Sequence, residues 1–588
     1  MKILLVAVNA KYIHSNLAVY SLKANCGKWE SQVELMEYSI NQYPEDILQS
    51  LYKKQADIVC FSCYIWNIQM IEQVAEWLKM VAPGIQIWLG GPEVSFDVKE
   101  RLEKWSFVDG IMYGEGESTF GDLMACWNNT MDAEAIDGIG HRHSDGTVDI
   151  HPPRDFVDMS LLNFVYTRPE DFENKIIYYE TSRGCPFQCS YCLSSVEKQV
   201  RFRDTELVKE ELQQFIDWGI PQVKFVDRTF NCRREHSMEI LHYIKEHDRG
   251  KTNFHFEITA DLLTEEELVF MAGLRPGLIQ LEIGVQSTNP ETLKAIRRHV
   301  SFEKLSEIVR RIHQSKNIHQ HLDLIAGLPF EGLERFKQSF NDVYALKPEQ
   351  FQLGFLKVLK GSYMREMAEE YGLIYRPEPP YEVLATNWLS YEDILALKAV
   401  EDMVEVYYNS RQFENSLEWL EKYFSSAFDM YEALADYYEK EGLKEISHSR
   451  MSRYKIFLDF AGQYLNQENQ SVFRQLLTYD LYLRENVKSR PEWAASQDMY
   501  KSAYVEFFRK DESRGKYFEG YEAYTTKQIQ RMTHVEHFNV DIPAIIRGEA
   551  GSRKSVYLWF DYLHRDPLTW RSQTIEVTID EIDEERES

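Results

Sequence analysis

The sequence predicts an α/β protein in which two regions of alternating strands and helices precede a mainly helical carboxyl-terminal part. Apolar strand-like runs alternate with amphipathic segments over residues 1–140, and the alternation resumes over 176–370. Residues 141–175 are polar and contain three prolines, which is typical of a linker. Over 371–588 the apolar spacing is mainly helical. A chain of 588 residues has room for about three domains.

The first region is predicted to form a sheet with helices on both faces. Five apolar runs are separated by helix-like segments such as Ile68–Val81, in which Ile71, Val74 and Leu78 fall on one face. Strands that alternate with helices imply a parallel, doubly wound, Rossmann-like sheet. The expected strands are 2–8, 32–38, 57–62, 86–89 and 110–113.

Unusual residues cluster directly after these expected strands. Ligands of doubly wound sheets bind outside the carboxyl ends of the strands, and glycine there permits close backbone approach. An ordinary strand-end turn is the alternative for each position. The candidate binding residues are His14 after the first strand, Ser62 and Tyr64 after the third, Gly90, Gly91 and Pro92 after the fourth, and Gly114, Glu115 and Gly116 after the fifth.

Three cysteines, Cys185, Cys189 and Cys192, lie in a short loop after the first apolar run of the second region. Thiolates are soft ligands that suit iron–sulfur clusters and zinc. A closed structural site needs a fourth ligand, and no second Cys-x-x-Cys pair lies nearby. Three cysteines at this spacing therefore favour a four-iron (4Fe–4S) cluster with one iron open to a ligand. A zinc loop and incidental core cysteines are the alternatives.

This cysteine pattern, with Tyr191 as the aromatic residue before the last cysteine, resembles the signature of the radical S-adenosylmethionine (SAM) enzymes. The resemblance implies that SAM chelates the open iron and that its reductive cleavage yields a 5′-deoxyadenosyl radical. It also implies a flavodoxin- or ferredoxin-type electron donor. The six strand–helix units of the second region resemble the partial (β/α)6 barrel of this family, whose active site lies at the carboxyl ends of the strands.

The resemblance further suggests SAM contacts at these strand ends. Family members often hold the SAM amino group with Gly-Gly-Glu, which is absent here, and Asp227 is the nearest acceptor by position. Pairing with Arg228 and capping of the following helix are the alternatives for Asp227. Glu257 matches the position that contacts the SAM ribose or amine. The residues that match the adenosine pocket are Gly284, Gln286, Ser287 and Gly327.

The Gly-Gly-Pro and Tyr-Gly-Glu-Gly-Glu elements of the first region resemble the cobalamin-binding domain found in front of many members of that family. A Rossmann-like domain that binds a nucleotide or no cofactor is the alternative, but the first loop lacks Gly-x-Gly-x-x-Gly. His14 is a candidate axial ligand of cobalt, although the aspartate and glycine of Asp-x-His-x-x-Gly are missing. The expectation is a lower cobalt face that is unligated, open to water or covered by a loop side chain.

Composition limits the partners. The chain has 94 acidic and 66 basic residues and a net charge of −28, which argues against nucleic acid as a partner, although a local basic groove stays open. No apolar run approaches the ~18 residues of a membrane span, and the amino terminus lacks a signal-peptide pattern. We therefore expect a cytoplasmic protein with no membrane partner. Cys60 and Cys63 are expected to be core and loop thiols.

The leading hypothesis is a cobalamin-dependent radical SAM methyltransferase that acts on an unactivated carbon of a small molecule or modified biomolecule. By the resemblance, one SAM methylates the cobalt and a second is cleaved to the radical that removes hydrogen from the substrate. Two alternatives stay open. One is an enzyme that uses both cofactors for cyclisation or rearrangement without methyl transfer, and the other is a cobalamin- or redox-sensing binding protein.

Overall fold

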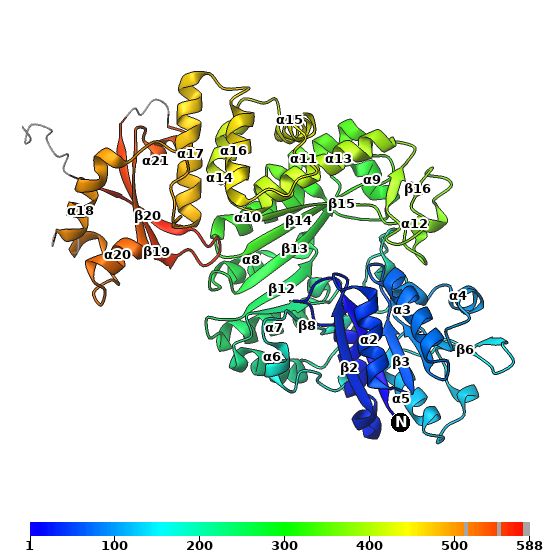
Figure 1. Cartoon of the computed structure of the whole chain (residues 1–588). Helices are drawn as coiled ribbons and strands as arrows, with labels where there is room; N and C mark the ends of the chain where they lie inside the picture. The colour runs from blue at the N-terminus through cyan, green and yellow to red at the C-terminus, as the bar shows by residue number, and fades with distance from the viewer. Residues whose placement is uncertain (511–514, 550–553, 580–588) are drawn as a thin grey trace, which may run out of the picture. The chain divides into compact units, whose positions relative to one another are not determined.

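The computed structural model describes residues 1–510, 515–549 and 554–579, and it separates into two compact units (Figure 1). The first unit comprises Met1–Phe336 and Gly354–Tyr391, and the second comprises Lys337–Leu353 and Glu392–Ser588. Both predicted strand–helix regions therefore fall mainly in the first unit. Of the helices in the described ranges, none has the length and apolar character needed to cross a bilayer.

The first unit begins with a seven-stranded sheet, drawn in blue and cyan in Figure 1. Its order is β2-β1-β3-β4-β5-β6-β7. The first five of these strands run parallel, β6 runs antiparallel to β5, and β7 runs antiparallel to β6. The five predicted strands are confirmed to within one residue at each end. The strands are β1 Ile3–Asn9, β2 Val33–Ser39, β3 Ile58–Ser62, β4 Gln86–Gly90, β5 Gly110–Met112, β6 Ile139–Arg142 and β7 Val148–Ile150.

Helices cover both faces of this sheet, as predicted. Successive side chains of a strand point to opposite faces, so Leu4 and Val6 of β1 join one apolar core while Ile3 and Leu5 join the other. The helices α2, α3 and α4 pack into the first core, and α1 and α5 into the second. Their bounds are α1 Leu17–Ala24, α2 Pro44–Lys54, α3 Ile68–Val81, α4 Val98–Lys104 and α5 Gly116–Trp127.

The sheet extends beyond the predicted domain boundary at residue 140. Strands β6 and β7 form a hairpin that occupies the first ten residues of the predicted linker. The sequence pattern missed β7 because it is an edge strand of three residues with exposed Asp149 and Ile150, so it lacks a continuous apolar run. The connection between the two sheets therefore begins at about residue 151.

The second sheet of the first unit contains β14, β13, β12, β11 and β8 in that order, and these five strands run parallel. All six predicted strands are present. Helices between them begin at clear caps; for example, Thr264 and Glu267 form a capping box at the start of α8. The strands are β8 Ile177–Tyr179, β11 Gln222–Phe225, β12 Asn253–Ile258, β13 Ile279–Gln286, β14 His319–Ala326 and β15 Gln350–Phe355. The helices are α6 Thr205–Trp218, α7 Arg234–His247, α8 Glu265–Ala272, α9 Pro290–Ala295, α10 Phe302–Ser315 and α11 Leu333–Tyr344.

Residues 354–391 complete the first unit and contact its amino-terminal sheet. They contain α12 Tyr363–Glu366, β16 Ile374–Tyr375 and β17 Val383–Ala385. The hydroxyl of Tyr381 donates to the buried carboxylate of Glu93, and Lys360 lies 2.7 Å from Asp97. The first unit therefore continues to residue 391.

The second unit is mainly helical, as predicted, and includes a three-stranded antiparallel sheet in the order β18-β19-β20. Alternating apolar residues over 555–560 and 574–579 predict two of these strands, β19 and β20, whereas β18 was not predicted. The helices are α13 Tyr391–Met403, α14 Glu414–Glu421, α15 Ala427–Lys440, α16 Arg450–Ala461, α17 Gln467–Arg484, α18 Lys501–Arg509, α20 Thr526–Met532 and α21 Ile542–Ile546. The strands are β18 Thr533–Phe538, β19 Val556–Arg565 and β20 Ser572–Val577.

Candidate functional site

The three cysteines lie in a loop between the short antiparallel strands β9 Ser182–Arg183 and β10 Arg201–Phe202. Gly184 begins this loop with φ +89°, and a Cβ there would lie 2.3 Å from the carbonyl oxygen of Gln199. Only glycine permits this approach, so the loop closes directly against the return strand. Cys189 is buried, whereas Cys185 and Cys192 are half-buried.

The spacing of the three sulfurs distinguishes a cluster from a single metal ion. Sulfurs around one tetrahedral zinc ion are about 3.8 Å apart, because each Zn–S bond is about 2.3 Å long. Among the described residues, three groups of side chains bring three ligand atoms within 4.8 Å of one another, and the cysteines are not one of them. The wider arrangement suits the four-iron cluster and disfavours the zinc loop.

Polar side chains contact the cluster cysteines. Arg298 donates from Nη1 to Cys189 Sγ at 3.7 Å and from Nη2 to the carbonyl oxygen of Gly284. Thr229 Oγ1 lies 3.6 Å from Cys185 Sγ. Burial raises the pKa of the Cys185 thiol, so in this fold the thiolate needs a compensating cation. Burial also raises the pKa of Tyr191, beside Cys189. Sequence reasoning missed Arg298 because it lies far from the cysteine motif along the chain.

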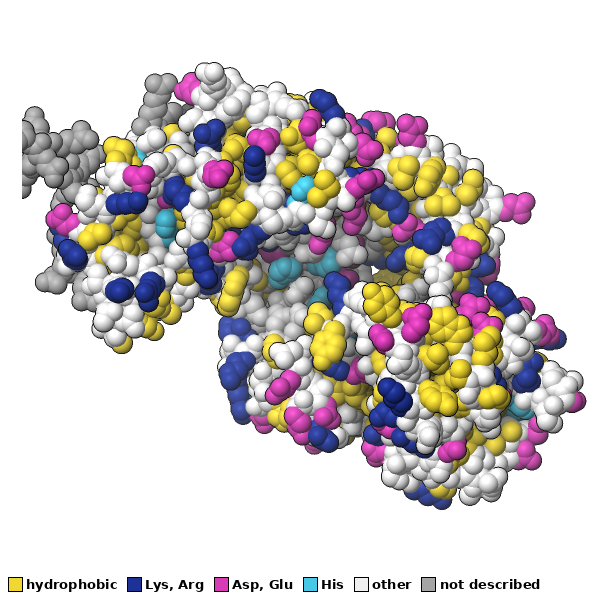
Figure 2. All heavy atoms as spheres, in the orientation of Figure 1, with side chains coloured by type: hydrophobic (Ala, Val, Ile, Leu, Met, Phe, Trp, Pro, Cys, Tyr) yellow, Lys and Arg dark blue, Asp and Glu magenta, His cyan; other side chains and the backbone are white. Residues whose placement is uncertain are grey.

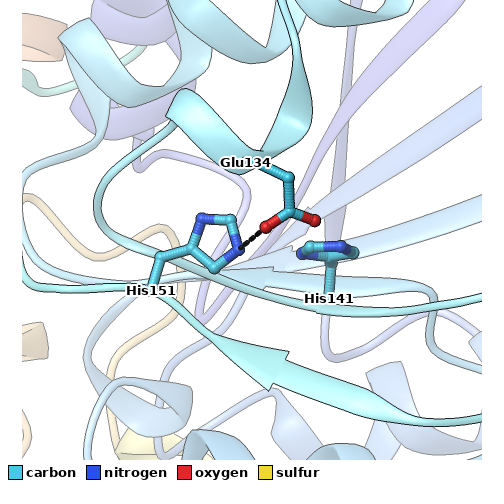
Figure 3. A group of neighbouring side chains, drawn as sticks. All are labelled: Glu134, His141 and His151. Atoms are coloured by element: carbon cyan, nitrogen blue, oxygen red, sulfur yellow. Dashed lines mark ion pairs between the residues drawn. The ribbon is translucent and has the colours of Figure 1, made fainter.

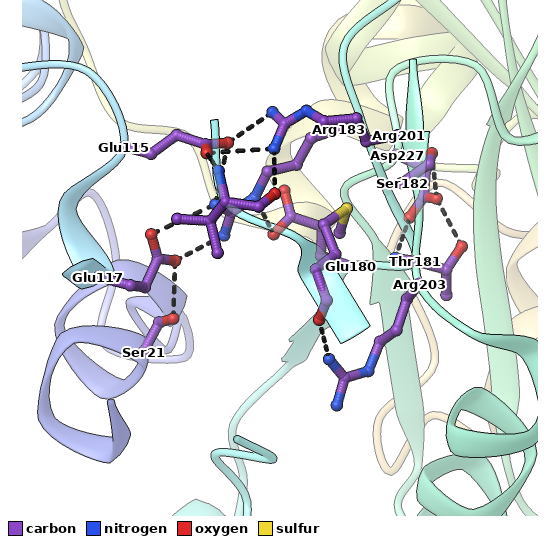
Figure 4. A network of polar contacts seen from close by, with 12 residues as sticks. Ser21, Glu115, Glu117, Glu180, Thr181, Ser182, Arg183, Arg201, Arg203 and Asp227 are labelled. Carbon is purple, nitrogen blue, oxygen red and sulfur yellow. Dashed lines mark hydrogen bonds and ion pairs between the residues drawn. The ribbon is translucent and has the colours of Figure 1, made fainter. Parts of the chain in front are cut away.

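Asp227 is fully buried and holds the residues that precede the cysteine loop (Figure 4). Its carboxylate accepts from Thr181 N at 2.9 Å, from Thr181 Oγ1 at 2.6 Å and from Ser182 Oγ at 2.5 Å. A SAM ammonium group would have to displace these donors. The geometry therefore favours an anchoring role over both the predicted SAM contact and the alternatives that involve Arg228 or a helix cap.

Asp227→Asn should lower the iron content per chain together with stability. An amide has one acceptor oxygen and places its NH2 group against donors, which costs about 1–3 kcal/mol for the unsatisfied buried groups. The measurements are iron per chain and urea unfolding, with the exposed Asp217→Asn as a matched control. Normal iron and stability with weakened SAM binding would instead support the predicted SAM contact.

The four residues predicted to line the adenosine pocket fall into two groups. Gly284 and Gln286 flank a register shift in β13, near Arg298. The hydroxyl of Ser287 is buried and donates to Glu331 at 2.7 Å. Gly327 has φ +90°, and a Cβ there would lie 2.6 Å from Val383 Cγ1, so its lack of a side chain is explained by packing. Gly284 and Gln286 thus lie on the cluster side of the sheet, whereas Ser287 and Gly327 have structural partners.

Glu257 of β12 is the predicted SAM contact whose ionisation is most altered. Burial, and then the neighbouring charge of Glu282, raise its pKa to about 7. The carboxylate is therefore about half protonated at neutral pH. Because only the ionised form accepts freely from two ribose hydroxyls, ligand binding at Glu257 would depend on pH near neutrality.

SAM affinity should rise by up to about tenfold between pH 6 and pH 8 if Glu257 binds SAM. The ionised fraction increases over this interval because the pKa of Glu257 lies near 7. Equilibrium binding of SAM to the reconstituted protein measures this, and Glu257→Gln should remove the pH dependence while the exposed Glu303→Gln keeps it. A pH-independent affinity in the unmodified chain would contradict the contact.

A charged cluster that sequence reasoning missed lines the second sheet beside Glu257. Glu282 Oε2 lies 3.0 Å from both Lys224 Nζ and His255 Nε2, and His321 Nε2 lies 3.0 Å from Asp323 Oδ1. Burial would raise the pKa of Glu282, but the hydrogen bond with His255 and the charge of Lys224 outweigh it and lower the pKa to about 2. The signal for this cluster was the alternation of ionisable residues along β12 and β14, since alternate residues of a strand share a face.

His14, the candidate axial ligand of cobalt, contacts the second sheet. Its Nδ1 lies 2.6 Å from the hydroxyl of Tyr178 on β8, and Ser15 Oγ donates to the carbonyl of Ile176 at 2.9 Å. Burial and the charge of Lys11 lower the pKa of His14. The imidazole is therefore held in its neutral form with Nδ1 occupied, which leaves Nε2 as its available atom.

Aromatic side chains and open backbone surround the switch point between β1 and β3, where ligands of such sheets bind. Tyr64 stacks on Trp66 with ring centroids 4.3 Å apart and an interplanar angle of 9°, and Trp66 is 44% exposed. Trp66 and Asn67 both donate to the carbonyl of Val8, and Asn67 also donates to that of Ser62. Gly114 has φ +77° with no atom within 4 Å of a built Cβ. This end of the sheet offers flat apolar rings and accessible backbone, which fit a large planar cofactor.

Two of the predicted glycines have packing reasons instead. Gly91 has φ +109°, and a Cβ there would lie 2.6 Å from the carbonyl oxygen of Cys63; Cys63 N in turn donates to the carbonyl of Gly90 at 2.7 Å. A Cβ on Gly116 would lie 2.8 Å from Leu22 Cδ2. Pro92 begins a short 3-10 turn. Burial raises the pKa of Cys63 to about 12, which agrees with the predicted inert thiol.

Glu115 belongs to an ion-pair network that joins the first sheet to the cysteine loop (Figure 4). Its carboxylate lies 3.1 Å from Arg183 and 2.6 Å from Arg201, and it accepts from Val157 N at 2.7 Å. Arg183 also lies 2.6 Å from Glu117. Glu115 is thus paired with two arginines, and because Arg183 stands two residues before Cys185, these pairs link the first sheet to the cysteine loop. The cofactor contact of Glu115 stays a prediction.

Comparison with known proteins agrees with this architecture. Residues 3–124 match the family model described as B12 binding domain, and residues 179–343 match that described as Radical SAM superfamily. The chain therefore contains a B12-binding domain followed by a radical SAM domain, in the predicted order. Residues 369–560 match a third family, described as Protein of unknown function (DUF4080), which distinguishes its carboxyl-terminal part.

Two curated relatives and one solved structure are informative. The cobalamin-dependent radical SAM methyltransferase TokK of Streptomyces tokunonensis is 26% identical over 56% of this chain and 51% of TokK. The anaerobic magnesium-protoporphyrin IX monomethyl ester cyclase of Cereibacter sphaeroides is 21% identical over 52% of each chain. The chain thus spans about half the length of these relatives. The structure of the cobalamin-dependent SAM radical enzyme OxsB, with aqua-cobalamin and SAM bound, has a TM-score of 0.57 at 15% identity and covers 81% of this chain and 78% of OxsB.

The domains identify the cofactors as a 4Fe–4S cluster, SAM and cobalamin. The residues present fit them. The three cysteine sulfurs are spaced too widely for one ion, and the switch point of the first sheet carries exposed rings and an open glycine. Cys185, Cys189 and Cys192 would hold the cluster, and the loops after β1, β3 and β5 would hold cobalamin.

Proposed function

We propose that this protein is a cobalamin-dependent radical SAM methyltransferase that methylates an unactivated carbon. The observation that carries the proposal is the direct contact between the two cofactor domains within one compact unit. His14, at the cofactor end of the first sheet, reaches Tyr178 of the second, and Glu115 reaches Arg183 beside the cysteine loop. When bound, the cluster and SAM supply a radical that removes hydrogen from the substrate, and cobalamin supplies the methyl group.

Residues of both domains hold the beginning of the cysteine loop in place. Asp227 fixes Thr181 and Ser182, and Arg183 binds carboxylates of the first domain, so the residues before Cys185 are held from both sides. Such positioning supports catalysis because reacting groups must be held in a productive geometry. Arg298 places a positive charge at Cys189 and stabilises a negatively charged cluster.

The charged cluster of the second sheet supports a polar substrate. Lys224, His255, Glu282, His321 and Asp323 bring several ionisable groups of both signs to one partly buried face. A ligand with polar groups can hydrogen-bond to these partly buried side chains, whereas an apolar ligand would displace their water without offering a hydrogen bond. We infer a substrate with polar or ionic groups near the methylated carbon, and a reducing, cytoplasmic setting with a flavodoxin- or ferredoxin-type donor.

The proposed function does not include nucleic acid as a partner. On the face shown in Figure 2, basic and acidic side chains are interspersed. Together with the net charge of −28, this arrangement disfavours the phosphate contacts on which nucleic-acid binding depends.

A second candidate is radical chemistry without methyl transfer, favoured by the similarity to the magnesium-protoporphyrin cyclase. Product analysis separates the two functions. The protein is purified anaerobically from cobalamin-supplied cells, analysed for iron and cobalt, reduced and incubated with SAM and candidate polar substrates. Methyl transfer yields S-adenosylhomocysteine and 5′-deoxyadenosine together with a substrate heavier by one methylene.

The other outcomes are equally specific. A converted substrate with 5′-deoxyadenosine but no S-adenosylhomocysteine favours the cyclase-like function. Spectral changes with cobalamin but no SAM cleavage by a protein with full iron would indicate the sensing alternative and would contradict both enzymatic functions.

A further inference from the structure

The hairpin β6–β7 brings together a second group of metal-ligating side chains, away from the cofactor site (Figure 3). His141 lies on β6, His151 directly follows β7, and Glu134 lies in the 3-10 turn Ala133–Ala135. One ligand atom from each lies within 4.8 Å of the others, and Glu134 Oε2 is 4.0 Å from His151 Nε2. In the sheet order, β6 is separated from β3 of the switch point by β4 and β5.

The imidazole of His151 is oriented as a ligand. Its Nδ1 lies 2.7 Å from the carbonyl oxygen of Ile136, and since a carbonyl only accepts, Nδ1 carries the hydrogen. The lone pair of the neutral ring is then on Nε2, which faces Glu134. His151 is 8% exposed, and its Nε2 is buried without a hydrogen-bond partner. A backbone carbonyl that fixes the tautomer is the usual support of a metal-binding histidine.

His141, the second histidine of this group, also has a buried nitrogen. Its Nδ1 is buried without a hydrogen-bond partner, and its ring centroid lies 5.0 Å from that of His151.

We propose that His141, His151 and Glu134 form a binding site for a divalent transition-metal ion, for which zinc is the best match. Two imidazoles and one carboxylate are ligands that zinc takes in proteins, with a fourth position for water. The ion gives both orphaned nitrogens a partner and places a positive charge beside the Glu134 carboxylate. No cysteine takes part, so the site is chemically distinct from the cluster loop.

A third histidine of the hairpin, His143, differs from His141 and His151 because it has an acidic partner of its own. His143 lies 2.7 Å from Asp149 in a solvent-exposed pair, and the hydrogen bond with Asp149 raises the pKa of His143. His143 is thus engaged, although it also lies near Glu134. Replacing His143 therefore gives a matched control on the same strand.

The ion would fasten the hairpin to the turn that precedes it. His151 is where the chain leaves the sheet, and its carbonyl accepts from the hydroxyl of Tyr113. The carbonyl of the next residue, Pro152, accepts from Gly138 N at 2.7 Å. A few residues later Val157 contacts Glu115 and Arg201 of the interdomain network. A metal at His151 would therefore stabilise the beginning of the connection between the two domains.

The test measures zinc binding to the whole protein with its cluster and cobalamin in place. The protein is stripped with a mild chelator, titrated with zinc, and analysed for zinc, iron and cobalt per chain. We expect one zinc per chain in the unmodified protein and in His143→Ala. His151→Ala, His141→Ala and Glu134→Gln should each weaken zinc binding at least tenfold, with iron and cobalt unchanged.

Two further readouts keep the test decisive. X-ray absorption should give zinc–ligand distances of about 2.0–2.1 Å, as for nitrogen and oxygen, rather than the about 2.3 Å of sulfur in the cysteine loop. Zinc should raise the Tm of the unmodified protein and of His143→Ala but not that of His151→Ala. Zinc bound equally by the unmodified protein and by His151→Ala, or bound through sulfur, would overturn the proposal.

Discussion

Replacing Cys185, Cys189 or Cys192 with alanine should abolish both the cluster and the cleavage of SAM. The prediction is that each cysteine supplies one of the three protein bonds to the cluster, and all three lie in one loop between β9 and β10. We expect iron to fall from about four to below one per chain. Formation of 5′-deoxyadenosine should fall to the level of the reaction without protein.

The matched control is a cysteine of similar exposure outside the loop. Cys126, half-buried in α5, has no cluster residue around it, so Cys126→Ala should retain its iron and its SAM cleavage. Iron, sulfide and product analysis measure both variants. Full iron and activity in any variant of the loop cysteines would remove the assignment of the cluster ligands.

The cysteine loop could be predicted because its information is local. Three ligands within eight residues are held by one short loop, so their spacing along the chain fixes their chemistry. The strands could be predicted for a similar reason, since buried parallel strands are continuous apolar runs. The hairpin β6–β7 has no such run, so its strands were not predicted.

Glu115 and Asp227 have partners that could not be predicted from the sequence. Both are carboxylates at strand ends, which is where cofactor contacts are expected. Their partners decide their roles: Arg183 lies 68 residues from Glu115, and Thr181 lies 46 residues from Asp227. No local pattern encodes such a pairing, because it depends on how the two sheets are placed in the first unit.

Glycine is ambiguous for a related reason. Gly91, Gly114 and Gly327 all have positive φ, yet two of them pack against protein atoms and only Gly114 faces open space. A glycine in the sequence indicates a position that does not tolerate a side chain. It does not indicate whether protein atoms or a ligand lie beside that position. The charged cluster around Glu282 was missed because each member is an isolated ionisable residue until neighbouring strands are aligned.

Arg183→Met should destabilise the first unit by about 3–5 kcal/mol, because it removes one partner from a buried ion-pair network. Arg183 lies 2.6–3.1 Å from Glu115, Glu117 and Glu180, and its side chain is 16% exposed. The arginine stabilises these carboxylates, and its loss removes the ion pairs of Glu117 and Glu180 and leaves Glu115 paired with Arg201. Since Arg183 also precedes the cysteine loop, iron content should fall with stability.

Chemical denaturation of the protein measures this loss, and Arg168→Met is the matched control. Arg168 also has two acidic partners, Glu170 and Asp171, but its side chain is 65% exposed. Water screens that pair, so the control should leave the unfolding midpoint and the iron content unchanged. Equal effects of the two substitutions would mean that burial does not determine the strength of this network. A large effect of Arg183→Met alone would establish that one arginine couples the cofactor domain to the cysteine loop.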